Sequence, residues 1–306
     1  MTTNTDAALS HPTQGPGRAR VRLFFDLFKL RIGLVIGFTA VAGAAVTPGP
    51  AVSVRGFLLL AFAVTLASAA AGAFNQYVER DLDACMVRTR RRAFVTGRLV
   101  AGPRWLAAIL GIGLLGVVLA GVAFNTSTAL YTFLGAFTYG VVYTVWLKRR
   151  TGWNIVIGGL AGSFAVLAGA SAVTPAGALE PLALAFAAVL FLWTPPHFWS
   201  LAIAFRADYE AARVPMLPVI VGDARAARAV LAGAVLLVAA SLAPALLGMG
   251  WLYLVVAIGS GGYLLVTSTQ LALAPERRRA MVNFHATLIQ LTLLLVGAIV
   301  DNAFRA

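Results

Sequence analysis

The stretch that decides the fold is residues 56–92, GFLLLAFAVTLASAAAGAFNQYVERDLDACMVRTRRR. Its first part, residues 56–78, is apolar and has the length of a membrane-spanning helix, which takes about 17 to 25 residues. Three carboxylates and then four arginines follow directly, in a chain with only 11 acidic residues. This order predicts a membrane helix that ends in a polar site.

The spacing of the oxygen-bearing side chains places that site on one face of a helix. At about 100° per residue, Asn75, Glu79 and Asp83 share one face, whereas Asp81 points away. Amide and carboxylate oxygens suit Mg²⁺, which proteins often share with a substrate phosphate. The alternative is a solvated, charged helix end with no ligand.

The composition places the whole chain in the membrane class. Of 306 residues, 60% are hydrophobic and 11% are charged, against about 25% charged residues in soluble domains. The net charge of +13 would suggest a nucleic acid partner in a soluble protein, but the positions of the charges argue against one. The single cysteine, Cys85, excludes an internal disulfide.

Nine apolar stretches predict an all-α, polytopic membrane protein. We expect residues 1–20 to form a disordered cytoplasmic tail and residues 21–306 to form a single transmembrane domain. The predicted spans are 30–47, 56–78, 104–124, 128–147, 154–173, 182–204, 228–248, 251–272 and 282–300.

The basic residues predict the orientation of these spans. With nine spans, 22 of the 24 Lys and Arg residues fall on one side and only Arg55 and Arg305 on the other. Positive residues mark the cytoplasmic side, so we expect a cytoplasmic amino terminus and a periplasmic carboxyl terminus. Acidic clusters follow spans two and six, which predicts two pseudo-repeated four-helix halves plus one helix around a central cavity that opens to the cytoplasm.

Basic residues near the acidic motif are candidates for phosphate binding. Guanidinium groups match phosphate oxygens in bidentate geometry, which favours Arg88 and Arg92. Lys148 and Arg149 end the fourth span and could either bind a diphosphate or anchor the helix at the membrane surface.

A second polar region runs from Trp193-Thr194-Pro195-Pro196-His197-Phe198-Trp199 to Asp208. Two adjacent prolines inside a membrane helix remove hydrogen bonds and open room for a ligand. His197 is a functional candidate because a buried ionisable residue in a membrane is costly. The alternative role for its ring is to cap a carbonyl freed by either proline.

The acidic motif resembles the Asn-x-x-x-Asp-x-x-x-Asp motif of the intramembrane aromatic prenyltransferase superfamily, and the fuller pattern is similar to the branch that farnesylates protohaem. The similarity covers about residues 25–301. This sequence departs from the family pattern at several positions. Glu79 stands where the family has Asp, Ala93 where it has Pro, and Ala165-Val166 where it has Pro-Pro. The second acidic motif, around Asp208 and Glu210, is degenerate. The other supporting motifs are Met86-x-Arg88-Thr89-x-x-Arg92, Tyr143-Thr144-x-Trp146-Leu147-Lys148-Arg149, Asn154-Ile155-Val156-Ile157-Gly158-Gly159, the Trp193–Trp199 stretch and Pro215-Met216-Leu217-Pro218.

This resemblance implies transfer of a farnesyl group from farnesyl diphosphate to a vinyl group of haem B, with hydration, to give haem O for terminal oxidase assembly. It implies Mg²⁺ as cofactor, a place in the bilayer of a bacterial inner membrane with the active site on the cytoplasmic side, and a downstream haem-modifying enzyme as partner. The expected roles are catalysis and Mg²⁺ binding for Asn75, Glu79, Asp83 and Asp208, diphosphate binding for Arg88, Arg92, Lys148 and Arg149, and haem binding for His197.

Two other functions fit parts of the sequence. A prenyltransferase acting on a quinone precursor would share the acidic motif, but the Trp193–Trp199 stretch stands where a second well-formed aspartate motif would be expected. A membrane transporter would place ionisable residues near the bilayer midplane, whereas these carboxylates follow the ends of spans.

Overall fold

The computed structural model describes residues 16–305, which form helices joined by loops and contain no strand. The helices are α1 (Pro16–Leu27), α2 (Leu30–Val46), α3 (Val54–Val78), α4 (Arg80–Cys85), α5 (Pro103–Ala123), α6 (Thr126–Phe137), η1 (Thr138–Leu147), α7 (Asn154–Gly158), α8 (Leu160–Val173), η2 (Gly177–Leu179), α9 (Pro181–Ala204), α10 (Arg206–Ala211), α11 (Leu217–Val221), α12 (Asp223–Leu246), α13 (Trp251–Leu273) and α14 (Arg277–Arg305).

The all-helical, multi-pass prediction is confirmed. Each predicted apolar stretch coincides with a helical segment, and eight helices among the described residues are long and apolar enough to cross a membrane. A ninth span depends on counting α1 and α2 together, although the chain bends by 56° between them. The count of nine therefore stays a prediction.

The described part of the amino-terminal segment begins with a helix. Residues 1–15 lie outside the described residues, so the predicted tail is not addressed there. Residues 16–20, which we assigned to a disordered tail, instead form the beginning of α1. The helix starts at Pro16, whose fixed φ angle suits the first position of a helix.

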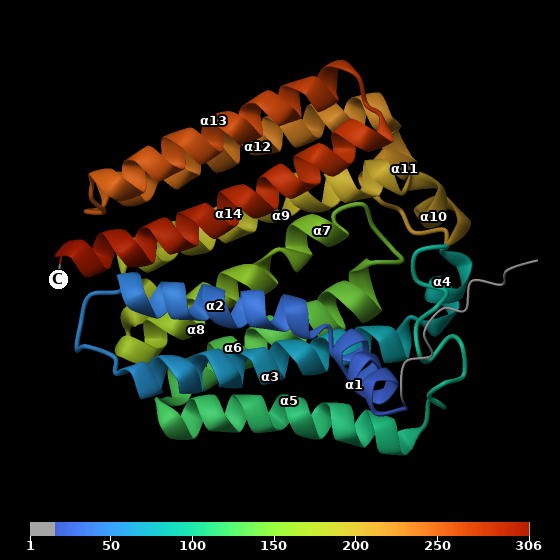
Figure 1. Ribbon diagram of the computed structural model, residues 1–306, viewed down its shortest axis with the longest axis horizontal. Coiled ribbons are helices and arrows are strands. Elements are labelled where there is room, and N and C mark those ends of the chain that lie inside the picture. The colour runs from blue at the N-terminus through green and yellow to red at the C-terminus, as the bar shows by residue number, and fades with distance from the viewer. Residues whose placement is uncertain (1–15, 306) are drawn as a thin grey trace, which may run out of the picture.

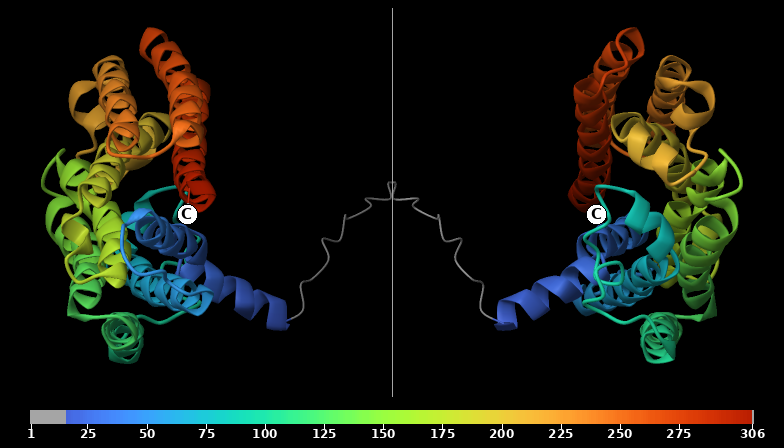
Figure 2. Two further views of the ribbon diagram at one scale, coloured as in Figure 1. Left: turned by 90° about the vertical axis from the view of Figure 1, so that its left-hand side faces the viewer. Right: turned by 90° about the vertical axis from the view of Figure 1, so that its right-hand side faces the viewer.

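The long helices lie side by side in one bundle (Figure 1), and Figure 2 views them nearly along their axes. Helices α12 and α13 form one edge and α5 the other. The short helices α4, α10 and α11 lie together at one end of the bundle, with α1 beside them, and the carboxyl end of α14 lies at the other. We call the end with α4 and α10 the basic end, because the loops, short helices and helix ends there carry most of the arginines.

Two helix ends at the basic end are built alike. After α3 the backbone departs from helical geometry at Glu79 (φ −90°, ψ 21°) and the six-residue α4 follows. After α9 it departs at Phe205 (φ −124°, ψ 33°) and the six-residue α10 follows, with Asp208 in its first turn. Both short helices thus carry acidic residues just beyond a membrane helix. This likeness supports the predicted repeat of two halves, which otherwise stays a prediction, as does the central cavity.

The fourth predicted span changes its helical form halfway. Its second part, η1, is a π-helix of ten residues that follows α6 without a break. The backbone N–H of Lys148 continues this pattern by donating to the backbone oxygen of Tyr143, five residues earlier, at 2.9 Å. A π-helix is rare and often occurs at a functional site, and this one leads directly to two candidate phosphate-binding residues.

Glycines allow α2 and α8 to pack at backbone distance. A Cβ added at Gly169 would overlap the backbone oxygen of Ala40, and one added at Gly43 would overlap that of Val166. Small residues permit such close approach between membrane helices, where packing is a main source of stability. The two glycines therefore fix the distance between α2 and α8.

Replacing Gly169 with alanine should destabilise the protein, because the added methyl group forces α2 and α8 apart. Overpacking typically costs about 1 to 3 kcal/mol, so we expect the thermal unfolding midpoint in detergent to fall by several degrees. Gly259→Ala on α13 is the matched control, because a Cβ there meets nothing within 4 Å and alanine favours a helix by about 1 kcal/mol over glycine. Equal midpoints for the two variants would contradict this account of the packing.

Candidate active site

The acidic motif lies at the basic end, where α3 gives way to α4. Asn75, Glu79 and Asp83 are buried, with 2%, 1% and 2% of their surfaces exposed. The backbone N–H of Glu79 donates to the backbone oxygen of Asn75 (3.0 Å), and the backbone N–H of Asp83 donates to the backbone oxygen of Glu79 (2.8 Å). The spacing of one helical turn therefore continues through the departure at Glu79, and the three side chains stay on the inner side, as the spacing predicts.

Asp81 points away from these three residues. Its side chain is 63% exposed and accepts two hydrogen bonds of 2.7 Å from the Arg149 guanidinium. Those hydrogen bonds hold the pKa of Asp81 below its ordinary value, so this carboxylate is charged at neutral pH. Arg149 therefore faces an exposed carboxylate, and it is itself exposed.

Both buried carboxylates form ion pairs. The Lys148 ammonium, at the end of η1, donates to Glu79 Oε2 at 2.6 Å. Arg92 Nη1 lies 2.7 Å from each oxygen of Asp83. The second oxygen of Glu79, Oε1, is buried and has no hydrogen-bond partner among the described residues. The pair of carboxylates thus retains one free acceptor in a position shielded from water.

Lys29 is a site residue that the sequence analysis missed, because it was counted only among the charges that set orientation. It lies at the bend between α1 and α2 in a left-handed conformation (φ 47°, ψ 42°). Its ammonium donates to Asn75 Oδ1 at 2.7 Å and to the Tyr139 hydroxyl at 3.1 Å. Asn75 in turn donates to Thr144 Oγ1 at 3.1 Å. The bend therefore brings a third cation to the acidic motif.

Asp208 lies near this group but is used differently. Its two oxygens accept hydrogen bonds from the backbone N–H groups of Val87 and Arg88, both at 3.2 Å. These bonds join the loop after α4 to α10. Within residues 16–305, no three His, Cys, Asp or Glu side chains are close enough together to hold a metal ion. Asp208 thus orders the loop that carries Arg88, while the predicted shared metal site stays a prediction.

Arg88 lies over an aromatic ring at the same end. Its guanidinium carbon is 5.6 Å from the ring centre of Phe205, the residue that joins α9 to α10. Arg277 approaches the same ring at 5.2 Å. Arg88 is exposed and has no ion-pair partner among the described residues, so its guanidinium remains available to an anion.

His197 lies on α9, away from the carboxylates. It is buried with 5% of its surface exposed, and its Nδ1 is 2.7 Å from Thr287 Oγ1 of α14. The prolines free the backbone oxygens of Phe191 and Leu192, four residues before each, and His197 bonds Thr287 instead of either. The alternative role of capping a carbonyl freed by the prolines is therefore not the one that the hydrogen bonds of residues 21–305 support.

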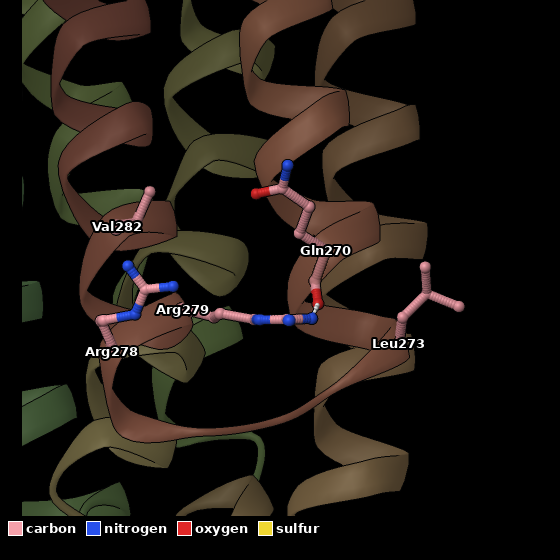
Figure 3. A pocket seen from close by; sticks show the side chains of 5 residues that line it. All are labelled: Gln270, Leu273, Arg278, Arg279 and Val282. Carbon is pink, nitrogen blue, oxygen red and sulfur yellow. Dashed lines mark hydrogen bonds between the residues drawn. The ribbon is translucent and has the colours of Figure 1, made fainter.

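A surface pocket between the ends of α13 and α14 contains none of the candidate residues (Figure 3). Arg279 spans it by donating to the backbone oxygen of Gln270 at 2.9 Å. The residues that line it are Gln270, Leu273, Arg278, Arg279 and Val282. It has no acidic group that could bind a cation, and we do not assign the site to it.

The chain is similar to known proteins over most of its length. Residues 36–294 match the family model described as the UbiA prenyltransferase family. The chain is 53% identical over 283 residues to protoheme IX farnesyltransferase 2 of Paramagnetospirillum magneticum, covering 92% of this chain and 98% of that protein. It is 41% identical over 289 residues to protoheme IX farnesyltransferase 1 of Cenarchaeum symbiosum, covering 93% and 97%.

Solved structures show the same fold at low sequence identity. A UbiA homolog from Archaeoglobus fulgidus bound to DMAPP and Mg²⁺ aligns with a TM-score of 0.70 and 16% identity, over 89% of this chain and 98% of that one. A digeranylgeranylglyceryl phosphate synthase structure aligns with a TM-score of 0.74 and 16% identity, over 93% and 99%. With the family match extending over most of its length, the chain belongs to the UbiA prenyltransferase family.

Proposed function

We propose that this protein transfers the farnesyl group of farnesyl diphosphate to a vinyl group of haem B. The carbon–oxygen bond to the diphosphate breaks, the farnesyl carbon joins the terminal vinyl carbon, and water adds a hydroxyl group to the inner vinyl carbon. Diphosphate and one proton are released, and the product is haem O. The observation that carries this proposal is the 53% identity over nearly the full length to a protoheme IX farnesyltransferase.

The residues at the acidic motif fit a hard cation. Asn75, Glu79 and Asp83 offer oxygen ligands, and Glu79 Oε1 is buried without a partner, a costly arrangement that a ligand would relieve. We assign Mg²⁺ to these three residues, with Asp208 supplied from α10. When bound, the ion would neutralise charge on the leaving diphosphate; the Archaeoglobus homolog bound to DMAPP and Mg²⁺ supports this assignment.

The neighbouring cations fit the diphosphate. Lys148 and Arg92 now neutralise carboxylates, and their long side chains can turn to phosphate oxygens that arrive with a cation. Arg88 has no ion-pair partner among the described residues, and Lys29 contacts a neutral amide. Arg149 is already paired with exposed Asp81, so we assign it the outermost place in diphosphate binding.

Aromatic rings adjoin these cations on the side toward the membrane. Tyr139 and Tyr143 stack with ring centres 5.7 Å apart, and the Lys148 ammonium lies 5.7 Å from the centre of Tyr143. Ring faces stabilise a nearby positive charge, and apolar surroundings keep water from a reactive intermediate. We therefore assign these two tyrosines to the wall that faces the allylic carbon as the diphosphate leaves.

The orientation follows from the distribution of charge. The basic end, with the proposed active site, would face the cytoplasm and the carboxyl end of α14 the periplasm. The protein would then lie in the bacterial inner membrane and take farnesyl diphosphate from the cytoplasmic side. A haem-modifying enzyme that consumes the product would be its partner.

The direct test uses purified protein in detergent with haem B, farnesyl diphosphate and Mg²⁺, followed by mass spectrometry of the extracted porphyrin. We expect a mass increase equal to one farnesyl group plus water, and we expect a chelator to abolish it and added Mg²⁺ to restore it. Unmodified haem alongside retained binding of farnesyl diphosphate would contradict haem as acceptor and point to a quinone precursor.

Replacing Asp83 with asparagine should lower turnover on the order of 100-fold, the scale seen when a group that stabilises developing charge is removed. The change keeps the side-chain size but removes the charge that binds the cation. Asp81→Asn is the matched control on the same short helix, since Asp81 is exposed and faces away, and it should retain activity within a few-fold. Steady-state rates and size-exclusion profiles are the measurements, and equal loss in both folded variants would remove Asp83 from the site.

Replacing Lys29 with methionine should raise the KM for farnesyl diphosphate about tenfold with a smaller change in kcat. One charge-assisted hydrogen bond contributes about this much to binding, and methionine retains the packing of the stem. Arg31→Met, two residues away and exposed, controls for the loss of positive charge. An unchanged KM for Lys29→Met would exclude Lys29 from the diphosphate site.

A further inference from the structure

The imidazole of His197 is held by aromatic rings on both faces. Trp193 stacks on one side with ring centres 4.1 Å apart, and Phe284 of α14 stacks at 4.3 Å, with angles of 21° and 25° between the planes. A ring covered on both faces can reach a ligand only through its edge. A metal ion approaches an imidazole nitrogen along the ring plane, which these two stacked rings do not cover. Phe198 also contacts the imidazole, at a ring-centre distance of 4.9 Å and an angle of 83°.

One edge of the imidazole is occupied by Thr287. Nδ1 of His197 lies 2.7 Å from Thr287 Oγ1. The same hydroxyl lies 2.7 Å from the backbone oxygen of Phe284, to which it donates. A carbonyl oxygen can only accept, and a hydroxyl has a single proton. With the hydroxyl proton directed to Phe284, Thr287 accepts from His197, and in this arrangement Nδ1 carries the proton.

The tautomer decides what His197 can do. With the proton on Nδ1, a neutral imidazole has its lone pair on Nε2. This is the form in which histidine binds metals, and the hydrogen bond on the other nitrogen raises the basicity of the ligand. Among residues 21–305 no hydrogen bond to Nε2 is formed. The free nitrogen is thus an acceptor without an assigned partner.

The backbone of Thr287 also orients Trp193, one of the two aromatic rings that stack on His197. Its carbonyl oxygen accepts a hydrogen bond from the Trp193 indole at 2.8 Å. One residue of α14 therefore orients both His197 and the ring that stacks on it.

We propose that Thr287 is a positioning residue that holds His197 as the Nδ1-protonated tautomer, with Nε2 as the axial ligand of the haem iron. This inference rests on the proposed function, because it takes haem as the acceptor. It places the acceptor subsite against α9 and α14, apart from the diphosphate site at the end of α3. Trp193 and Phe284 hold the imidazole plane in the orientation that Nε2 needs.

The test is a titration of full-length protein with ferric haem B, followed by absorption and electron paramagnetic resonance spectra of histidine ligation. Thr287→Val has nearly the same shape but lacks the hydroxyl that accepts from Nδ1–H, and it should weaken histidine-ligated haem binding about tenfold, at the lower end of the effect of such supporting groups. Thr287→Ser keeps the hydroxyl and should restore wild-type affinity. His197→Gly should lose the signature and regain it when free imidazole is added.

Binding of farnesyl diphosphate provides the control for folding and should be unchanged in every variant. Wild-type spectra and affinity in Thr287→Val would overturn the role of Thr287, and loss of both ligands in Thr287→Ser would indicate a structural role only. Thr287-dependent histidine ligation without any farnesylated product would support the haem subsite while contradicting the proposed reaction. The two hypotheses therefore fail in different measurements.

Discussion

The structure depends on the neutralisation of two buried carboxylates at the end of α3. Glu79 and Asp83 are almost completely removed from solvent, and an ionised carboxylate buried without a partner is very costly. Their partners come from separate parts of the chain: Arg92 lies nine residues beyond Asp83, and Lys148 lies 69 residues beyond Glu79. Burial of these charges therefore requires η1 and the loop after α4 to meet α3.

The same requirement gives the site its chemistry. A buried ion pair adds little stability compared with apolar packing, so stability alone does not account for these pairs. In the proposed reaction the carboxylates exchange their side-chain cations for Mg²⁺, and the released cations meet the diphosphate. The total charge of the site then stays balanced when substrate binds. Lys29 extends this arrangement, because the bend between α1 and α2 directs a third cation to Asn75.

The opposite side of the proposed site is organised by neutral hydrogen bonds. Asn283 of α14 donates to Ser200 of α9 at 2.9 Å and accepts from Thr267 of α13 at 2.8 Å. Together with the contacts of Thr287, these bonds join three helices within an apolar region, where helix association has no hydrophobic driving force. Ion pairs therefore hold together the helices around the proposed diphosphate site, and neutral hydrogen bonds hold together the helices around the proposed haem site.

The sequence by itself determined the helical segments and the face of the acidic motif. Apolar length and helical periodicity are local properties, so the spans agree closely with the observed helices, and the opposite orientations of Asp83 and Asp81 followed from an angle of 100° per residue. Departures from regular geometry were decided by the tertiary structure. The bend that directs Lys29 to Asn75, the hydrogen bonds of Asp208 to the backbone at Arg88 and the pairing of His197 with Thr287 all join residues far apart in the chain, and the local change to a π-helix in η1 was not predicted either. Such contacts depend on how helices pack, and one-dimensional periodicity does not contain that information.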